Sequence, residues 1–299
     1  MSESLEEVRK QIDNIDNQVH DLLMERASLV SSVAMAKKES GMQIVQPARE
    51  ARMMRRLLAR HKGPLPAKTI IRIWRELVGS VSLLQTGLSV AVADDGQGNF
   101  SHWDMAKNYF GSAVPMKSIK GYQAAISEVL EGRASFAVLP WPELDQEMPW
   151  WLHLFNRQNN DSEQIYVIGA LPYEKTGADP SEVLDKALII SKMMGYMPSD
   201  DDISFIGLEL SSDISRARIK QRVENAGFQV FNLYTGNIPH NDEVKVHLLQ
   251  VKGFVDNGSD PIKKLKEELG DSCYYCHAIG GYPVIPDIDK KPSEQEDAA

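Results

Sequence analysis

The chain has 299 residues, of which 42% are hydrophobic and 25% charged, enough for two or three domains with their own cores. Its formal net charge is −9, but residues 1–85 carry 14 Lys/Arg against 10 Asp/Glu, whereas the remainder carries 19 against 32. No run of about 18 apolar residues predicts a membrane span, and the acidic first residues lack a signal-peptide pattern, so we expect a cytoplasmic protein. The basic N-terminal part favours a small anionic ligand over nucleic acid, which requires a broader basic surface.

The N-terminal part predicts one long helix with a heptad seam. Arg26 takes one position of this seam, and apolar residues take the others at alternating spacings of three and four: Leu5, Val8, Ile12, Ile15, Val19, Leu22, Leu29, Val33 and Ala36. No Gly or Pro precedes Gly41, so the helix can run for about 35 residues, roughly 50 Å. A compact domain does not bury so long a helix against itself, whereas a helix of a second subunit can.

Three cations of this helix are candidates for anion binding. Arg26 occupies a position where Leu is expected, and a desolvated guanidinium needs an anion. Lys37 follows about three turns later on the same face, whereas Arg9 is rotated by about 100°. Arg26 and Lys37 therefore suit one pocket, and Arg9 suits another, which in an intertwined dimer belongs to the partner. The alternative is a solvated basic face on a coiled coil.

Two shorter helices follow. Pro47 stands at a first helical position and opens a basic helix that ends before Gly63. Pro64 and Pro66 separate it from a third helix, residues 67–85, whose apolar positions keep the helical period. Three helices of which one is very long favour an all-α, intertwined dimeric domain.

This arrangement resembles the all-helical, AroQ-class chorismate mutase family over residues 1–86. Residues 8–16 (VRKQIDNID) are similar to the opening motif of that family, and Arg26 and Lys37 fall at its next two cations. Residues 47–50 (PARE) match the Arg-Glu pair of the second helix, and Gln85 matches the Gln near the end of the third. Together these positions are specific, whereas any one alone is weak.

The resemblance implies the Claisen rearrangement of chorismate to prephenate in phenylalanine and tyrosine biosynthesis, by a homodimer with shared active sites. No metal and no cofactor is implied, because the reaction transfers no proton and uses no nucleophile. The enzyme must hold a dianion in its compact shape and stabilise the charge that develops on the ether oxygen. By this resemblance, the catalytic residues Lys37 and Gln85 donate hydrogen bonds to the ether oxygen. Arg26 and the partner's Arg9 clamp the two carboxylates.

Four further residues complete the implied substrate-binding site. Arg49 supports its electropositive wall, and Glu50 accepts a hydrogen bond from the substrate hydroxyl. Gln46 stands where the family often has Asp, and Val81 stands where a Ser precedes the terminal Gln by one turn. Gln46 keeps an acceptor, whereas Val81 removes one carboxylate contact. We expect neither change to abolish activity, because the main cations and Gln85 remain.

Residues 87–175 predict an α/β region that resembles the first lobe of prephenate dehydratase. Strands near 88–93 and 135–139 flank a glycine-bearing turn at 96–101 and two helices. A dehydratase-like region downstream of a mutase-like region resembles the domain order of the bifunctional chorismate mutase/prephenate dehydratase, the P-protein. However, residues 140–144 (PWPEL) replace the family's Pro-Ile-Glu-Asn-Ser, and residues 163–165 (EQI) replace its Thr-Arg-Phe. Dehydration needs a positioned acid, so we predict an inactive, degenerate dehydratase-like region.

Residues 200–286 predict a βαββαβ order, which is ferredoxin-like. This region resembles the ACT regulatory domain, and residues 280–283 (GGYP) are similar to its closing motif, but its phenylalanine-binding motifs are not recognisable. Residues 287–299 predict a disordered tail. The sequence Cys273-Tyr-Tyr-Cys276-His277 matches the haem-attachment pattern. A regular strand places the two Cys on opposite sides, so we expect buried thiols instead.

The sequence therefore predicts a multidomain protein: an all-α dimeric domain, a partial dehydratase-like α/β region and an α+β, ACT-like region. Its predicted activity is that of a chorismate mutase acting on chorismate, without nucleic-acid or membrane partners. A bifunctional mutase–dehydratase and a non-enzymatic regulator on a mutase scaffold are the alternatives. Retention of the principal cations favours the enzyme.

Overall fold

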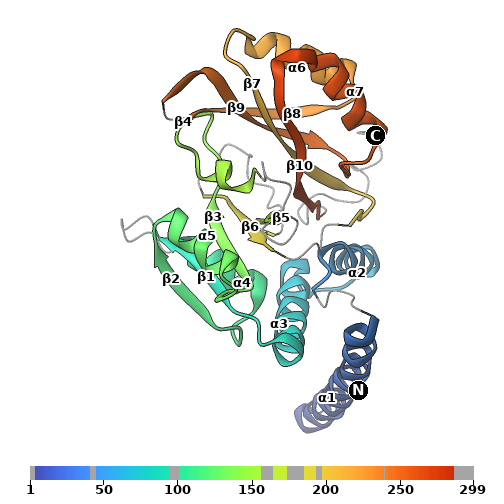
Figure 1. The fold of residues 1–299 in the computed structure, drawn as a ribbon. Helices are drawn as coiled ribbons and strands as arrows, with labels where there is room; N and C mark the ends of the chain where they lie inside the picture. Colours follow the sequence, from blue (N-terminus) through green and yellow to red (C-terminus); the bar gives the residue numbers. More distant parts are fainter. Residues whose placement is uncertain are drawn as a thin grey trace.

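The computed structural model describes residues 4–40, 45–94, 101–155, 164–173, 185–192, 197–238 and 240–285, without the side chains of residues 31–40 and 86. An N-terminal helical region is followed by α/β regions built on one long sheet (Figure 1). Residues 96–100 of the turn predicted at 96–101, and the predicted tail at 287–299, lie outside the described residues. No described helix combines the length and apolar composition that a bilayer-spanning segment needs.

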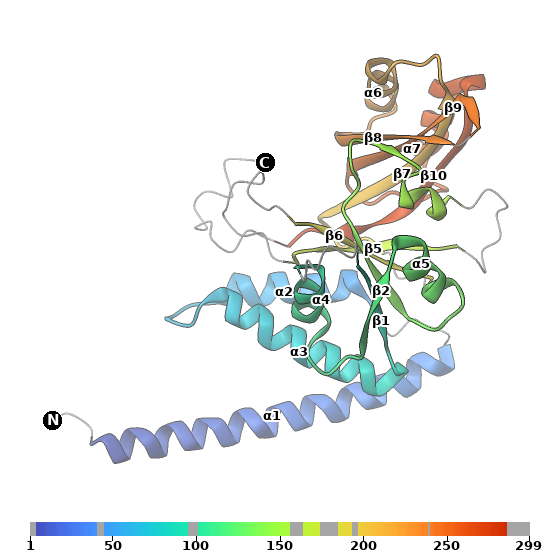
Figure 2. The same ribbon diagram turned by 90° about the vertical axis from the view of Figure 1, so that its left-hand side faces the viewer.

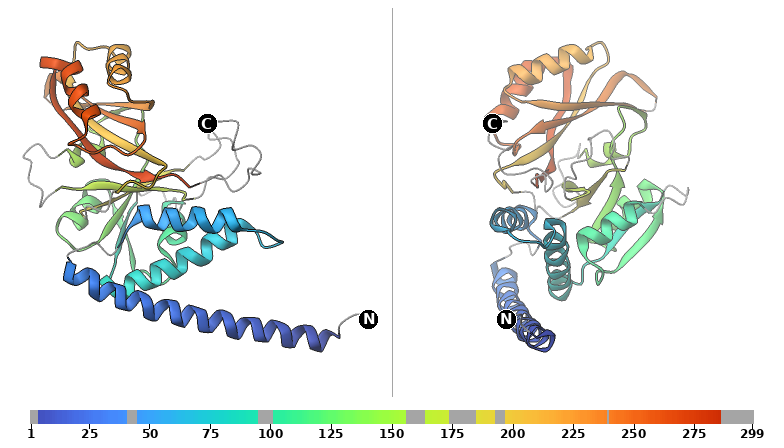
Figure 3. Two further views of the ribbon diagram at one scale, coloured as in Figure 1. Left: turned by 90° about the vertical axis from the view of Figure 1, so that its right-hand side faces the viewer. Right: turned by 180° about the vertical axis from the view of Figure 1, so that it is seen from behind.

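The N-terminal region consists of three helices, as the periodicity predicts: α1 (Leu5–Ser40), α2 (Pro47–Arg60) and α3 (Ala67–Thr86). Pro47 begins α2, where its missing N–H costs no hydrogen bond. Figure 2 shows α2 and α3 as a hairpin beside the sheet, with α1 as a long rod outside them. Figure 3 shows the same arrangement from two further sides.

The long helix α1 leaves most of its apolar seam uncovered. The exposed fractions of its large seam side chains lie between 48% and 67%, for Leu5, Ile12, Ile15, Val19, Leu22 and Leu29. A second face of α1, which meets the seam at Arg26, is partly buried between positions 23 and 30. Its partly buried residues are Leu23, Arg26, Ala27 and Val30. A single chain thus partly covers Arg26 and its neighbours and leaves most of the described apolar heptad positions exposed.

Among the described residues, the remaining strands build a ten-stranded sheet of order β2-β1-β3-β6-β5-β10-β7-β9-β8-β4. Its strands are β1 (Val90–Asp94), β2 (Met116–Lys120), β3 (Phe136–Pro140), β4 (Asp145–Glu147), β5 (Tyr166–Leu171), β6 (Ala187–Ser191), β7 (Asp202–Ser211), β8 (Val230–Ile238), β9 (Asn241–Lys252) and β10 (Cys273–Pro283). The helices are α4 (Ser101–Phe110), α5 (Tyr122–Leu130), α6 (Arg216–Asn225) and α7 (Asp260–Leu269), with 3-10 turns η1 (Trp150–Leu154) and η3 (Gly270–Ser272).

The helices and the turn η1 cover the two faces of the sheet. At the β1 end, α4 packs on the face that contains Val90 and Val92, and α5 packs on the face that contains Ala91 and Ala93. At the other end, α6 and α7 cover one face and η1 covers the opposite face. The strands β10-β7-β9-β8 have the split βαβ order that the sequence predicts for residues 200–286.

Two strand pairings, β4 with β8 and β5 with β10, join the two α/β regions, which the sequence analysis treats as separate. Strand β5 lies parallel to β10, with Val167 opposite Gly280. Gly280 has a φ of +100°, and a Cβ at this position would lie 2.1 Å from the carbonyl oxygen of Val167. Only glycine allows this approach, so the close pairing depends on one residue.

The expectation that Cys273 and Cys276 face opposite sides is wrong. A β-bulge at Tyr274 shifts the register of β10 on β7, so that Cys273 lies opposite Leu210 and Cys276 opposite Leu208. Because Leu208 and Leu210 share one face, both Cys point to the core under α6 and α7. Cys276 is buried there and Cys273 is partly buried.

A buried histidine links this fold to pH. His247 in β9 is 2% exposed; its Nδ1 lies 3.2 Å from Thr235 Oγ1, and its buried Nε2 has no hydrogen-bond partner among the described residues. Burial, with smaller contributions from Arg216 and Lys245, lowers the pKa of His247 to about 4. The folded protein therefore holds this imidazole neutral, whereas the unfolded chain protonates it near pH 6.5.

We predict that acid destabilises the fold through His247. Between pH 6.5 and 4 the unfolded chain binds a proton that the folded chain does not, so the free energy of unfolding falls by about 1.4 kcal/mol per pH unit, or about 3 kcal/mol in all. Urea unfolding of the wild type and His247→Asn from pH 8 to 4 measures this, because Asn retains a polar group near Thr235 but does not titrate. Parallel pH dependences of the two proteins would contradict the prediction.

Candidate active site

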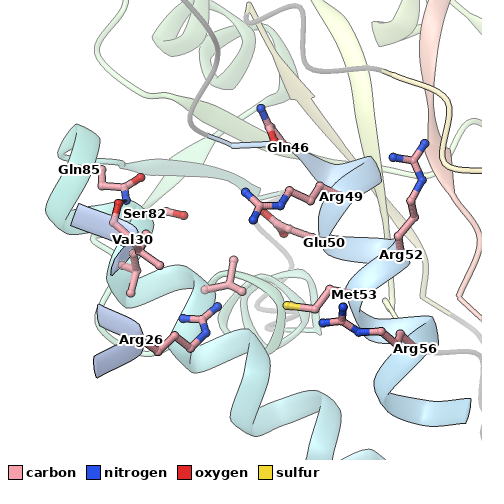
Figure 4. Close-up of a pocket in the computed structure, with 12 residues that line it drawn as sticks. Arg26, Val30, Gln46, Arg49, Glu50, Arg52, Met53, Arg56, Ser82 and Gln85 are labelled. Atoms are coloured by element: carbon pink, nitrogen blue, oxygen red, sulfur yellow. Dashed lines mark hydrogen bonds between the residues drawn. The ribbon is translucent and has the colours of Figure 1, made fainter. Parts of the chain in front are cut away.

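A basic cavity of about 410 Å³ lies between the three N-terminal helices (Figure 4). It brings together six of the eight residues that the sequence analysis assigns to a site: Arg26, Gln46, Arg49, Glu50, Val81 and Gln85. Val30, Arg52, Met53, Arg56, Val78 and Ser82 complete its lining. Residues from three separate helices thus meet in one place.

Helical spacing explains which residues line this cavity. On α2 the lining positions 49, 52, 53 and 56 follow the i, i+3, i+4, i+7 pattern of one helix face, and on α3 so do 78, 81, 82 and 85. Arg26 and Val30 on α1 are likewise one turn apart. Arg52, Met53 and Arg56 were not predicted, although the period that starts at Arg49 indicates them.

The cavity carries more positive than negative charge. Its lining includes four arginines and one acid, Glu50. One of the arginines, Arg52, is compensated from outside, because its Nε lies 3.0 Å from Asp200 Oδ2 and its Nη2 donates to the carbonyl of Pro198. Arg26, Arg49 and Arg56 supply the remaining positive charge, which favours a ligand with more than one anionic group.

Gln85 links the third helix to the first. Its Nε2 donates a hydrogen bond of 3.0 Å to the carbonyl oxygen of Val30, which also lines the cavity. The amide therefore stands at the wall between α1 and α3 with a donor already aligned. An amide nitrogen carries two hydrogens, so Gln85 can donate to a second acceptor in the cavity while it keeps its bond to Val30.

Glu50 is held by a buried residue that the sequence analysis missed. Arg75 of α3 has 4% of its side chain exposed, Glu50 has 13%, and Arg75 Nη1 lies 2.7 Å from Glu50 Oε2. Burial alone lowers the pKa of Arg75, but Tyr109, Glu50 and Tyr173 together raise it more, so the guanidinium stays charged. Burial also raises the pKa of Tyr109 to about 12, which keeps that phenol neutral.

Two predicted site residues are not placed in this cavity. Arg9 is exposed on α1, and it lies seventeen residues, about 25 Å of helix, before Arg26. Lys37 belongs to α1, but its side chain lies outside the description. Their roles stay predictions.

A second cavity of about 310 Å³ lies beside β10, where Lys266, Cys273, Cys276 and His277 line it. Among the described residues, no group of three or more His, Cys, Asp or Glu side chains is arranged to hold a metal ion. The first cavity is therefore the stronger candidate, because charged residues of α1 and α2 and the amide of Gln85 on α3 converge on it.

Residues 8–86 match the model of the family described as chorismate mutase type II. They form a chorismate mutase domain. The twelve described residues that line the basic cavity lie within this domain. The prediction of a chorismate mutase domain at the N-terminus is thereby confirmed.

Relatives of known name agree with this assignment. The bifunctional chorismate mutase/prephenate dehydratase of Stutzerimonas stutzeri is 31% identical over 144 residues, which cover 46% of this chain and 39% of the relative. The chorismate mutase of Methanocaldococcus jannaschii is 48% identical over 50 residues, 17% of this chain and 50% of the relative. The chain thus spans about two-fifths of the length of the bifunctional relatives it matches.

Among solved structures, the prephenate dehydratase from Streptococcus mutans is 13% identical, with a TM-score of 0.45. The match covers 67% of this chain and all of that chain.

Proposed function

We propose that this protein is a chorismate mutase, which rearranges chorismate to prephenate in the cavity between α1, α2 and α3. The observation that carries the proposal is the meeting of four residues that match the family pattern, Arg26, Arg49, Glu50 and Gln85, in one basic cavity of the chorismate mutase domain. The reaction breaks an ether C–O bond and forms a C–C bond within one molecule. It needs no redox partner, so side chains alone can supply the catalysis.

The charges of the cavity suit the two carboxylates of chorismate. Arg26 from α1 and Arg49 from α2 lie on opposite sides of the cavity in Figure 4 and offer planar donors for a bidentate contact. Arg56 adds a third cation on the α2 wall. Holding both carboxylates restricts the substrate to its compact form, which lowers the entropic part of the barrier.

Gln85 and Lys37 are the proposed donors to the ether oxygen. Negative charge develops on this oxygen as the C–O bond breaks, so a donor there stabilises the transition state more than the substrate. Gln85 Nε2 is placed at the cavity wall by its contact with Val30. Glu50 accepts from the substrate hydroxyl, and Gln46 and Val81 complete the binding surface.

The proposed active form is an intertwined homodimer. Most of the described apolar positions of the α1 heptad stripe, from Leu5 to Leu29, are exposed in one chain, which is the pattern of a helix that packs against another helix. Such a pairing of α1 helices suits the delivery of the partner's Arg9 to the cavity, where it would clamp the second carboxylate.

The α/β regions are proposed to lack dehydratase activity. The proposed units are residues 87–175, dehydratase-like, and residues 200–286, ACT-like. Where the dehydratase motif is expected, Trp141 instead donates a hydrogen bond of 2.8 Å to Tyr234, and its ring packs edge-to-face against Phe205 and Tyr282. A residue so engaged in a core supports a structural use of this segment.

Purified protein incubated with chorismate, and separately with prephenate, tests the proposal. We expect chorismate to be consumed with formation of prephenate, and no phenylpyruvate from either substrate. Phenylpyruvate formation would contradict the loss of dehydratase activity. Absence of turnover of chorismate would overturn the mutase proposal and favour the regulator.

Gln85→Glu is expected to make the activity depend on pH. At pH 8 the carboxylate repels the developing ether oxyanion, so kcat falls by about 100-fold or more. As the pH falls towards 5 the carboxyl gains a proton and can donate, so kcat recovers in part. Steady-state kinetics of the wild type and of Gln85→Ala over the same pH range are the controls. A Gln85→Ala variant that recovers equally would exclude this donor role.

Mixed dimers test whether two chains share each site. Arg9→Ala and Arg26→Ala are each expected to lose most of their activity, about 100-fold, through the loss of a carboxylate contact. After co-refolding, half of the molecules are heterodimers, and each of these contains one intact site and one doubly altered site. Activity should then rise to about a quarter of that of the wild type. No recovery, with heterodimers verified by mass spectrometry, would argue against a shared site.

A further inference from the structure

The acid of the basic cavity is anchored by a group outside the cavity. Glu50 lines the cavity, whereas its ion-pair partner Arg75 does not. Arg75 lies on the side of α3 that packs against α4, and 3% of the whole residue is exposed. Because the pair is buried, either residue alone would leave an uncompensated charge in a site of low polarity.

The Arg75 guanidinium is fixed in three ways. Its Nη1 donates to Glu50 Oε2 at 2.7 Å, and its Nε donates to the backbone carbonyl of Tyr109 at 2.6 Å. The guanidinium carbon Cζ lies 3.8 Å from the centre of the Tyr109 ring and 5.0 Å from the centre of the Tyr173 ring. A planar group held by two directed hydrogen bonds and two rings has one orientation available to it.

The helix that carries Arg75 is itself locked to the α/β region. Glu76 accepts hydrogen bonds from the backbone N–H of Ser112, at 2.9 and 3.0 Å, and from its hydroxyl. One turn later, a Cβ on Gly79 would lie 1.7 Å from the carbonyl oxygen of Phe110, so only glycine allows α3 to lie this close to α4. The guanidinium therefore has its position set by α4 as well as by its own helix.

We propose that Arg75 is a positioning residue, which holds the Glu50 carboxylate in place for the substrate hydroxyl and is itself held by Tyr109 of the α/β region. The inference rests on the proposed mutase activity. Arg75 occupies Oε2 of Glu50 and leaves Oε1 as the oxygen for the substrate. It also compensates the charge of the acid, which the cavity arginines Arg26, Arg49 and Arg56 would otherwise attract towards the carboxylate-binding positions.

A contact to the hydroxyl, which does not react, is made in both the bound substrate and the transition state. Its loss therefore raises KM and leaves kcat nearly unchanged, whereas a loss of correctly folded enzyme lowers the apparent kcat and leaves KM unchanged. This difference separates positioning from a purely structural role.

Steady-state kinetics with chorismate on the full-length chain test the proposal. We expect Arg75→Gln to raise KM by about 10- to 100-fold, with kcat within about threefold of the wild type, because a buried acceptor loses its charged partner. Arg75→Lys keeps the charge but loses the planar fork, so it should raise KM by only about two- to fivefold. The matched control is Glu76→Gln, which weakens the same α3–α4 contact through Ser112 and should leave KM unchanged.

The double variant with Glu50 decides whether Arg75 acts through this acid. Glu50→Gln should raise KM as Arg75→Gln does, and the combination should add less than about twofold. If circular dichroism shows that Arg75→Gln does not fold, Arg75→Lys is compared in the wild-type and Glu50→Gln backgrounds. The substitution should then raise KM in the wild-type background and not in the Glu50→Gln background.

Three results would overturn the inference. The first is an unchanged KM in Arg75→Gln or, where that variant does not fold, in Arg75→Lys. The second is an Arg75 effect that persists in full in the Glu50→Gln background. The third is an equal effect of Glu76→Gln. Failure of the proposed function is distinct, because the wild type itself would then leave chorismate unchanged, and both proposals would fall together.

Discussion

The buried ion pair between Arg75 and Glu50 constrains the arrangement of the N-terminal helices. Two charges removed from water are costly unless geometry and further hydrogen bonds compensate them, and here the Tyr109 carbonyl and ring provide that compensation. These groups belong to α4, so the pair is satisfied only when α3 is docked on the α/β region. Helix α2 is docked on the α/β region as well. Its Arg55 donates hydrogen bonds to Ser199 and to the carbonyl of Val284.

This docking leaves α1 as the helix without a complete set of partners. Because α2 and α3 turn their outer faces to the sheet, α1 can contact them only by a narrow stripe that includes Arg26 and Val30. Most of its described apolar heptad positions remain exposed, with Leu22 and Leu29 more than half accessible. The same constraint that fixes one wall of the cavity thus leaves an apolar surface that suits a second copy of the chain.

The sequence predicts the elements and the cavity where local periodicity controls them. Gln46, Arg49 and Gln85 could be assigned because helical spacing and a family resemblance act together, and the structure places all three on one cavity. Arg75 could not be assigned, since a single Arg in an amphipathic helix resembles a solvated charge and its partner Tyr109 comes from another region. The predicted orientation of Cys273 and Cys276 was wrong for a similar reason, because the bulge at Tyr274 arises from the pairing of β10 with β7 and not from the sequence of β10 alone.

The joined sheet sets what the α/β regions can do. Gly280 lies so close to Val167 that β5 and β10 leave no room between them for a side chain. Trp141 also donates a hydrogen bond to Tyr234 between the two α/β regions. A cleft that opens and closes around a substrate needs two bodies with few contacts between them. A rigid junction instead suits a support, and the residues that α2 and α3 use for docking, Arg55 and Arg75, bind to this support. The chemistry would then lie in the helices, and the sheet would hold its acid in place.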